Sequence, residues 1–262
     1  MNTQPMNTRK LNPTLISPAL FSMIIWLSGM FVLSSCSTSN HSAQTSSLNT
    51  SAPANSAQQK KQQFFTFLKP VVKSENARIL QQRKKLLRLK SESRLSGREL
   101  AWLAQLASEY GLAITGQPST SDWQTLQARV DIIPVDMALV QAANESAWGT
   151  SRFAQQGNNY FGQWCYRKGC GIVPKHRTAG ATHEVQRFES VKHSVRTYMH
   201  NINTTHAYAG FRNIRQNLRM HKRPLNAEVL VAGLKSYSER GMAYVRIIQA
   251  MIRSNHALIQ RS

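Results

Sequence analysis

The feature that most constrains this chain is an almost uncharged stretch over residues 135–149, directly after Pro134. It reads VDMALVQAANESAWG and predicts a helix that is apolar nearly all round. A helix of this kind is usually buried, so the stretch predicts the centre of a helical core. Near its C-terminal end lies Glu145, which is the only acidic residue between Asp136 and Glu184.

Glu145 is a candidate general acid because of where this helix places it. A buried carboxylate without a partner is costly, and it is rare in proteins unless it has a function. The C-terminal end of a helix also disfavours an anion. Burial and the helix dipole both raise the pKa of such a carboxyl, and a carboxyl that stays protonated near neutral pH can donate a proton. The alternative is a frayed helix end at which Glu145 points into solvent.

The first 36 residues are predicted to be a lipoprotein export signal. Arg9 and Lys10 form a short basic region, and residues 11–33 carry no charge. A Leu-Ser-Ser-Cys sequence ending at Cys36 resembles a bacterial lipobox, in which the signal is cut before a cysteine that receives lipid. An uncleaved membrane anchor is the alternative, since the uncharged run is long enough to span a bilayer. We therefore expect a periplasm-facing lipoprotein of the bacterial cell envelope, anchored in the outer membrane.

Composition separates two further segments from the rest of the chain. Residues 37–59 are uncharged and rich in Ser, Thr, Asn, Gln and Ala, which predicts a disordered tether. Residues 60–111 are predicted to form a basic helical arm, with twelve Lys and Arg residues from Lys60 to Arg98. The arm either holds the protein on an anionic surface or presents an ordinary solvated helix face.

The formal net charge of +21 predicts an anionic partner. Nucleic acid is not expected, because an exported protein rarely meets it. The carboxylates of peptidoglycan peptides and the head groups of anionic lipids are the remaining candidates.

Residues 112–262 are predicted to form one domain that is mainly α with a small β-hairpin lobe, an α+β fold. Apolar residues recur at helical spacing over 191–202, 208–218 and 245–252. Between about residues 163 and 190 the pattern changes to Gly, Pro, Thr and short alternating pieces, which predicts the β lobe.

Cys165 and Cys170 are predicted to form a disulfide. They remain as a pair once Cys36 is assigned to lipid, and an exported protein folds in an oxidising compartment. Gly169 and Gly171 suit the tight turn that such a short loop needs. Zinc binding is the alternative, but it requires two more soft ligands and the chain has no further cysteine. We expect neither a metal nor a cofactor.

Several short motifs then follow one another in a recognisable order. The chain has Asn-Glu-Ser-Ala-Trp-Gly over 144–149, Asn-Tyr-Phe-Gly over 159–162 and Tyr-Ser-Glu-Arg-Gly over 237–241. This series resembles the bacterial N-acetylglucosaminidase domain of cell-wall autolysins and of the flagellar rod hydrolase. With Gly-Gln-Trp-Cys over 162–165 and Gly-Cys-Gly over 169–171, the resemblance is closest to Bax-type envelope proteins. It implies a lysozyme-like fold and a peptidoglycan glycan strand as the substrate.

The resemblance also implies roles for individual residues, with Glu145 as the catalytic acid. For the second carboxylate that glycosidases commonly use, Glu184 in the β lobe is the candidate, and the substrate's own acetamido group is the alternative. Tyr237 matches the family's active-site tyrosine and would stabilise developing charge, or else it is a packed core residue. Candidate sugar-contacting side chains are Trp164, Tyr160 and Tyr244.

Together these roles predict a peptidoglycan hydrolase that cleaves after N-acetylglucosamine by general acid catalysis, an endo-β-N-acetylglucosaminidase. Two other functions stay open. A lytic transglycosylase would share the fold and the single acid, but would cleave after N-acetylmuramic acid and leave an anhydro sugar. A non-catalytic envelope lipoprotein would bind glycan without cutting it.

Overall fold

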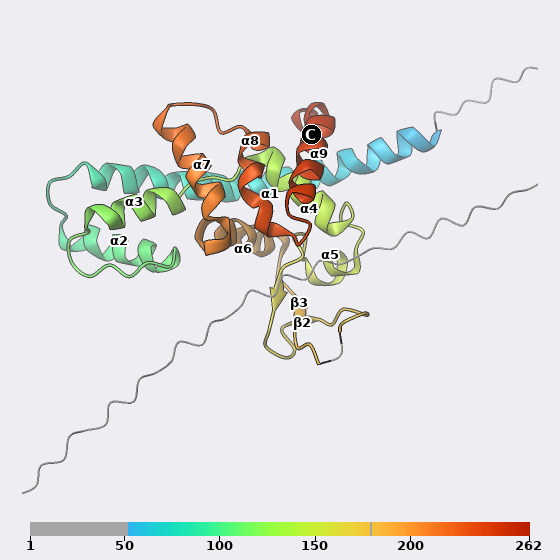
Figure 1. Ribbon diagram of the computed structural model, residues 1–262, viewed down its shortest axis with the longest axis horizontal. Helices are drawn as coiled ribbons and strands as arrows, with labels where there is room; N and C mark the ends of the chain where they lie inside the picture. Colours follow the sequence, from blue (N-terminus) through green and yellow to red (C-terminus); the bar gives the residue numbers. More distant parts are fainter. Residues whose placement is uncertain (1–51, 179) are drawn as a thin grey trace, which may run out of the picture.

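The computed structural model describes residues 52–178 and 180–262, with side chains from Ser56 onward. Most of this part of the chain is helical, and one small sheet is the exception (Figure 1). The predicted export signal, the lipidation site Cys36 and residues 37–51 of the predicted tether lie outside the described residues. Each helix in the described part is too short or too polar to cross a membrane.

The first helix, α1 (Ala52–Lys90), is longer than the sequence pattern predicts. It begins inside the predicted tether, before the predicted arm at residue 60, so a disordered tether over 52–59 is wrong, and it passes through Pro70. Extending a helix that packing has already nucleated is inexpensive for residues such as Ala and Gln. Pro70 removes the hydrogen bond to the carbonyl of Thr66, but both residues are exposed and water can bind that carbonyl instead.

The N-terminal half of α1 belongs to the main core rather than to a separate arm. It packs against α4 (Val135–Ser146) and α6 (Val191–Thr204), and α4 in turn packs against α9 (Met242–Arg261). The uncharged helix α4 is buried along most of its length, as its sequence predicts. Buried side chains of this core include Phe65, Leu68, Val72, Leu139, Val140, Tyr198, Phe211 and Ile248.

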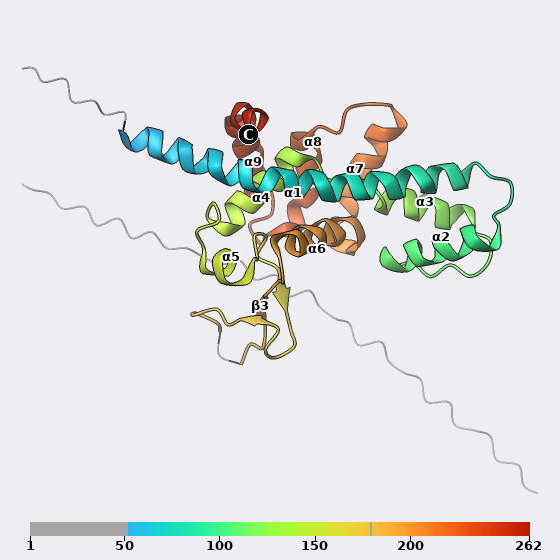
Figure 2. The same cartoon turned by 180° about the vertical axis from the view of Figure 1, so that it is seen from behind.

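A second, smaller core lies at the other end of α1. There the last turns of α1 pack against α2 (Gly97–Glu109) and α3 (Thr120–Arg129), which lie side by side at one end of the molecule (Figures 1 and 2). The helix α2 lies within the basic helical arm predicted over residues 60–111. The buried side chains of this second core include Leu86, Leu89, Leu103, Leu106, Tyr110 and Leu126.

Shorter elements complete the helical body: α5 (Arg152–Gly157), η1 (His206–Tyr208), α7 (Ala209–Met220), α8 (Ala227–Val231) and η2 (Ala232–Tyr237). Side-chain caps fix where the helices begin. Ser190 accepts the N–H of His193 at the start of α6, and Asn226 accepts the N–H of Val229 at the start of α8. Because η1 and η2 follow these two helices closely along the chain, the caps also help to position the tyrosines that η1 and η2 carry.

The β lobe projects from the helical body on the side of α5 and α6 (Figure 1). It is a three-stranded antiparallel sheet in which β3 (Glu184–Gln186) lies between β1 (Trp164–Cys165) and β2 (Gly171–Ile172). Val185 on the central strand pairs with both Trp164 and Ile172. The small β lobe is thus present where the sequence predicts it, with three short strands instead of one hairpin.

Candidate active site

Glu145 lies in the last turn of α4, and the backbone that follows it is tightly wound. Ala147, Trp148 and Gly149 all have positive φ angles, of 49°, 59° and 78°. For residues other than glycine this conformation is strained, and strain of this kind is concentrated at functional sites. Ser146 holds the turn, because its hydroxyl donates to a carbonyl one turn earlier at 2.6 Å and accepts the N–H of Gly149 at 2.8 Å.

Packing explains the tryptophan and the glycine of this motif. The Trp148 ring lies edge-on to Phe65, with 5.4 Å between the ring centres, and so fixes the turn against α1. A Cβ on Gly149 would contact the rings of both Phe64 and Tyr160 at 3.4 Å, and the φ angle of 78° favours glycine at this position. Each residue of the motif around Glu145 therefore shapes the turn that presents this carboxyl group.

The carboxyl group of Glu145 is partly buried and is hydrogen-bonded through one of its two oxygens. Its Oε1 accepts the hydroxyl of Tyr244 and the amide Nδ2 of Asn144, each at 3.0 Å. Burial raises the pKa of this carboxyl, and the two hydrogen bonds oppose the rise without cancelling it. Glu145 therefore keeps its proton to a higher pH than an exposed glutamate does, as a general acid requires.

Four tyrosines from four different elements surround Glu145, and we call them the tyrosine cluster: Tyr198 of α6, Tyr208 of η1, Tyr237 of η2 and Tyr244 of α9. The rings of Tyr237 and Tyr244 stack at 5.5 Å, and Tyr208 lies 5.8 Å from Tyr237. Burial raises the pKa of all four hydroxyls, to about 12 for Tyr208. The tyrosine cluster is therefore uncharged at neutral pH and gives Glu145 a weakly polar surrounding with hydroxyl donors.

A buried glutamine connects two members of the tyrosine cluster. The Tyr198 hydroxyl donates to Oε1 of Gln141 at 2.6 Å, and Nε2 of Gln141 donates to the Tyr244 hydroxyl oxygen at 2.9 Å. Gln141 is fully buried and lies one helical turn before Glu145 on α4. The Tyr244 hydroxyl then bonds to Glu145, so a continuous series of hydrogen bonds leads from α6 through α4 and α9 to the carboxyl group.

The Asn-Tyr-Phe-Gly turn lies beside the other oxygen of Glu145. Its last residue, Gly162, has a φ angle of 65°, and a Cβ there would lie 3.7 Å from Oε2 of Glu145. The Tyr237 hydroxyl donates to the carbonyl of Phe161 at 3.2 Å, and the Phe161 ring stacks on Tyr198 at 3.9 Å. Tyr237 therefore contacts the turn that borders the carboxyl group rather than the carboxyl group itself.

Asn159 joins this turn to the β lobe. Its Nδ2 donates to the carbonyls of Gln163 at 2.8 Å and Gln186 at 2.9 Å, and its Oδ1 accepts the N–H of Gln163 at 3.0 Å. Asn159 is buried, so these bonds satisfy a side chain that has no access to water. Asn159 thus fixes the position of the sheet relative to the turn that borders Glu145.

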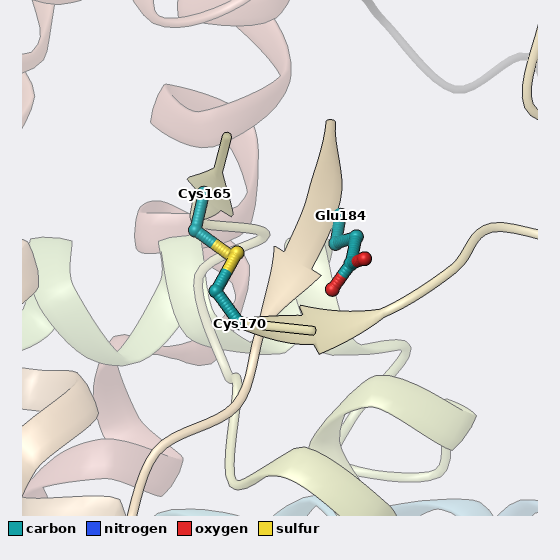
Figure 3. Close-up of side chains that lie close together, drawn as sticks. All are labelled: Cys165, Cys170 and Glu184. Carbon is teal, nitrogen blue, oxygen red and sulfur yellow. A yellow bond between two sulfur atoms is a disulfide. The ribbon is translucent and has the colours of Figure 1, made fainter. Parts of the chain in front are cut away.

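Glu184 lies in the β lobe, on the central strand and beside the disulfide. Its two oxygens accept the backbone N–H groups of Gly169 at 2.9 Å and Gly171 at 2.8 Å, and these bonds lower its pKa. Figure 3 shows its carboxylate turned toward the strand that begins after Cys170. The contacts of Glu184 among the described residues are thus with the β lobe, and they do not bring it to Glu145. Its role as the second catalytic carboxylate stays a prediction.

The predicted disulfide between Cys165 and Cys170 is confirmed, with 6.2 Å between the two Cα atoms. The sulfur atoms and a Glu184 oxygen lie within 4.8 Å of one another, in the manner of a metal site. However, the two sulfurs are bonded to each other and are not the thiolates that zinc binds. The disulfide and Glu184 together close and brace the loop at the edge of the sheet.

The three candidate sugar-contacting residues have different surroundings. Trp164 is half-buried on β1, with its ring 3.9 Å from that of His183. Tyr160 is half-buried against Phe67 of α1, at 6.0 Å between ring centres. Tyr244 is only 2% exposed, and its hydroxyl is bonded to Glu145 and Gln141, so it supports the acid instead of offering a face to a sugar.

Sequence comparison places this site in a known family. Residues 120–257 match the Glucosaminidase family, described as mannosyl-glycoprotein endo-beta-N-acetylglucosaminidase, and the chain belongs to this family of lysozyme-like glycan hydrolases. It is also similar to protein bax of Escherichia coli (strain K12), with 36% identity over 221 residues. That match covers 84% of this chain and 79% of the bax protein. No solved structure matches the chain significantly.

Reasoning from the sequence missed the residues that support Glu145 from behind, Gln141 and Tyr198. One signal was available for Gln141, because it is a polar residue four positions before Glu145 in an otherwise apolar helix. Residues at this spacing lie on the same helix face. Tyr198 carried no comparable signal, since it reads as one more apolar position on its own helix.

Proposed function

We propose that this protein is a peptidoglycan hydrolase that cleaves the glycosidic bond after N-acetylglucosamine, with Glu145 as the general acid. The observation that carries the proposal is the partly buried Glu145 carboxyl, whose pKa burial raises, at the end of α4 in a Glucosaminidase-family domain. The strong positive charge supports an anionic polymer such as peptidoglycan as the substrate.

In the proposed reaction, Glu145 gives its proton to the glycosidic oxygen as the bond from that oxygen to the anomeric carbon breaks. Positive charge develops on the sugar ring and has to be stabilised. Water finally supplies the hydroxyl group at the anomeric carbon, and its remaining proton returns to Glu145. The neutral tyrosine cluster suits this cycle, because burial among these side chains raises the pKa of the carboxyl and so favours its return to the protonated form.

The environment of Glu184 favours the substrate's acetamido group as the second participant. Both Glu184 oxygens already accept backbone N–H bonds, so this carboxylate would have to abandon them to reach a sugar or a water molecule. The acetamido oxygen of N-acetylglucosamine can instead attack its own anomeric carbon while the leaving oxygen is protonated, and water then opens the cyclic intermediate.

Product analysis tests the proposal. Purified full-length protein is incubated with sacculi, the products are reduced with borohydride, and the newly formed sugar alcohol is identified by mass spectrometry. We expect N-acetylglucosaminitol from the wild type and a rate lower by about 10²–10⁴ for Glu145→Gln. A Glu145→Gln variant that digests sacculi as fast as the wild type would contradict the role of Glu145.

The same experiment decides between the two enzyme classes. A lytic transglycosylase also depends on a single acid, and the engagement of Glu184 in the β lobe is compatible with that reaction. Anhydro-muramic acid ends among the products would establish transglycosylase activity and overturn the hydrolase proposal. Unchanged sacculi would leave glycan binding without cleavage as the function.

We further propose that the chain is a lipoprotein held through Cys36 on the periplasmic side of the outer membrane. This rests on the basic, uncharged and lipobox-like segments of residues 1–36. Globomycin treatment and Cys36→Ser should each block maturation and leave the precursor in the membrane fraction. A normally sized, soluble product from Cys36→Ser would remove the anchor.

A further inference from the structure

The hydrogen bonds behind Glu145 have only one consistent direction. The Gln141 amide has an acceptor oxygen and a donor nitrogen, and Tyr198 donates to the oxygen. The nitrogen therefore faces Tyr244 and donates to its hydroxyl oxygen. The single hydrogen of the Tyr244 hydroxyl is then left for the carboxyl group, so Tyr244 must donate to Oε1 of Glu145. Gln141 and Tyr198 are at most 1% exposed, so water does not compete for these bonds.

The direction of these bonds has a consequence for the proton of Glu145. Oε1 receives hydrogens from both Tyr244 and the Nδ2 of Asn144, so a third hydrogen on this atom would be crowded. When the carboxyl is protonated, the proton therefore belongs on Oε2. That oxygen faces Gly162, which has no side chain to cover it.

We propose that Gln141 and Tyr244 are positioning residues that fix Oε1 of Glu145 as a hydrogen-bond acceptor and so place its transferable proton on Oε2, toward Gly162. This inference rests on the proposed role of Glu145 as the acid. It assigns to Gln141 an effect on catalysis although its side chain is fully buried and hydrogen-bonds to Tyr244 and Tyr198 and not to the Glu145 carboxyl. The Tyr198 hydroxyl contributes by fixing which way the Gln141 amide faces.

The groups expected to change the titration of Glu145 are the tyrosines around it and Gln141. The titratable groups coupled to Glu145 are the four members of the tyrosine cluster, from α6, η1, η2 and α9. Three charged side chains of the neighbouring helices have other partners: Lys61 lies over the Trp148 ring, Lys69 donates to the end of α9, and Glu228 pairs with Arg253. Among the described residues, the hydrogen-bond donors to the Glu145 carboxyl are the uncharged side chains of Asn144 and Tyr244. A change in the titration of Glu145 on substitution of Gln141 would thus travel through Tyr244.

A double-mutant cycle tests this coupling. The alkaline limb of the pH profile of kcat/KM reports the pKa of the general acid in the free enzyme. The hydrogen bond from Tyr244 lowers the pKa of Glu145, so Tyr244→Phe should move the alkaline limb to higher pH and reduce kcat by up to about 100-fold through misorientation. Gln141→Met should move the limb in the same direction, because it frees the Tyr244 hydroxyl to turn away. In the Tyr244→Phe background, Gln141→Met should have no further effect on the limb.

Tyr110→Phe is the matched control. It removes an equally buried phenol hydroxyl, which bonds to Gln82 in the second core, and it should leave the limb in place. Shifts from Gln141→Met and Tyr244→Phe that simply add, or an alkaline limb that neither substitution moves, would overturn the inference.

A second measurement keeps the test independent of activity and of variants that fold poorly. The Glu145 carboxyl can be titrated by NMR in protein labelled with ¹³C at the glutamate carboxyl carbons, with Glu145→Gln to assign the signal. Gln141→Met should raise its pKa relative to wild type and to Tyr110→Phe, and an unchanged titration would count against the inference. If Glu145→Gln retains full activity while this coupling is observed, the proposed function fails and the positioning role of Gln141 stands as a structural fact.

Discussion

Glu145 and Glu184 are the two glutamates to which the sequence assigns catalysis, and their environments are opposite. Around Glu145 the donors are two side chains on a single oxygen, and burial dominates and raises the pKa. Around Glu184 two backbone N–H groups bind the two oxygens and lower the pKa. The first arrangement favours the protonated, neutral form of the carboxyl. The second favours the ionised carboxylate.

The difference teaches that the number and placement of donors decide what a partly or fully buried carboxyl can do. A carboxylate whose two oxygens are both bonded to the backbone is a structural anion, since protonation would break a hydrogen bond that holds the loop. A carboxyl with one unoccupied oxygen in a poorly solvated site can release a proton to a substrate and recover it. Of the two glutamates compared, Glu145 has the second arrangement.

The largest expected effect is on catalytic rate, and it separates the two glutamates directly. Glu145→Gln should lower kcat on sacculi by about 10²–10⁴, because the amide has no proton of suitable acidity. Glu184→Gln should change kcat by less than about tenfold, since no proton transfer depends on it. Steady-state rates of soluble muropeptide release measure both. Equal losses in the two variants would restore Glu184 as the second catalytic carboxylate.

A smaller effect is expected on the local order of the β lobe. Glu184→Gln puts an NH₂ group where one of two backbone N–H groups needs an acceptor, so the Gly169 and Gly171 amides should lose protection from hydrogen exchange. The lowered pKa of Glu184 means that its stabilisation is present above the pKa of the unfolded chain and is lost as pH falls through the folded-state value. The loss of protection relative to wild type should therefore be large at neutral pH and should vanish in acid.

Glu145→Gln provides the control for this measurement, because the two glutamine substitutions are chemically identical. It should leave the Gly169 and Gly171 amides as protected as in the wild type. Equal protection of these amides in Glu184→Gln and wild type at pH 7 would show that the two backbone bonds do not brace the loop.

A feature of the fold or of the candidate site could be predicted from the sequence where the residues that determine it are close together in the chain. The buried helix around Glu145 and the disulfide are local patterns, and both were predicted. The support of Glu145 is not local, because Gln141 meets Tyr198 across 57 positions and Tyr244 across 103. Which apolar-looking tyrosine reaches which polar group is decided only when α4, α6 and α9 pack together.

Glu184 illustrates a second limit of prediction from sequence. Its partners are backbone N–H groups, which every residue except proline possesses, so no residue type marks them. Their direction depends on the loop that the Cys165–Cys170 bond closes. A carboxylate in the expected region of the chain was therefore a reasonable candidate for catalysis, although its donors could not be read from the residues around it.

The smallest expected effect is on the pH dependence of global stability, and here the two glutamates should differ in sign. Burial raises the folded-state pKa of Glu145 above its value in the unfolded chain, which is about 4.3. Between these two values the folded state binds more protons, so stability falls as pH rises through this window.

Glu145→Gln removes that loss of stability, whereas Glu184→Gln removes a stabilising anion. At pH 7 the first variant should melt above the wild type, by roughly 2–4 °C for each kcal/mol recovered, and the second below it. Below about pH 4 both differences should shrink, because in the wild type the unfolded chain then carries its glutamates protonated. Melting curves of the three proteins at both pH values measure this, and a Glu145→Gln variant that melts below the wild type at pH 7 would mean that the charged form of Glu145 is not penalised by its surroundings.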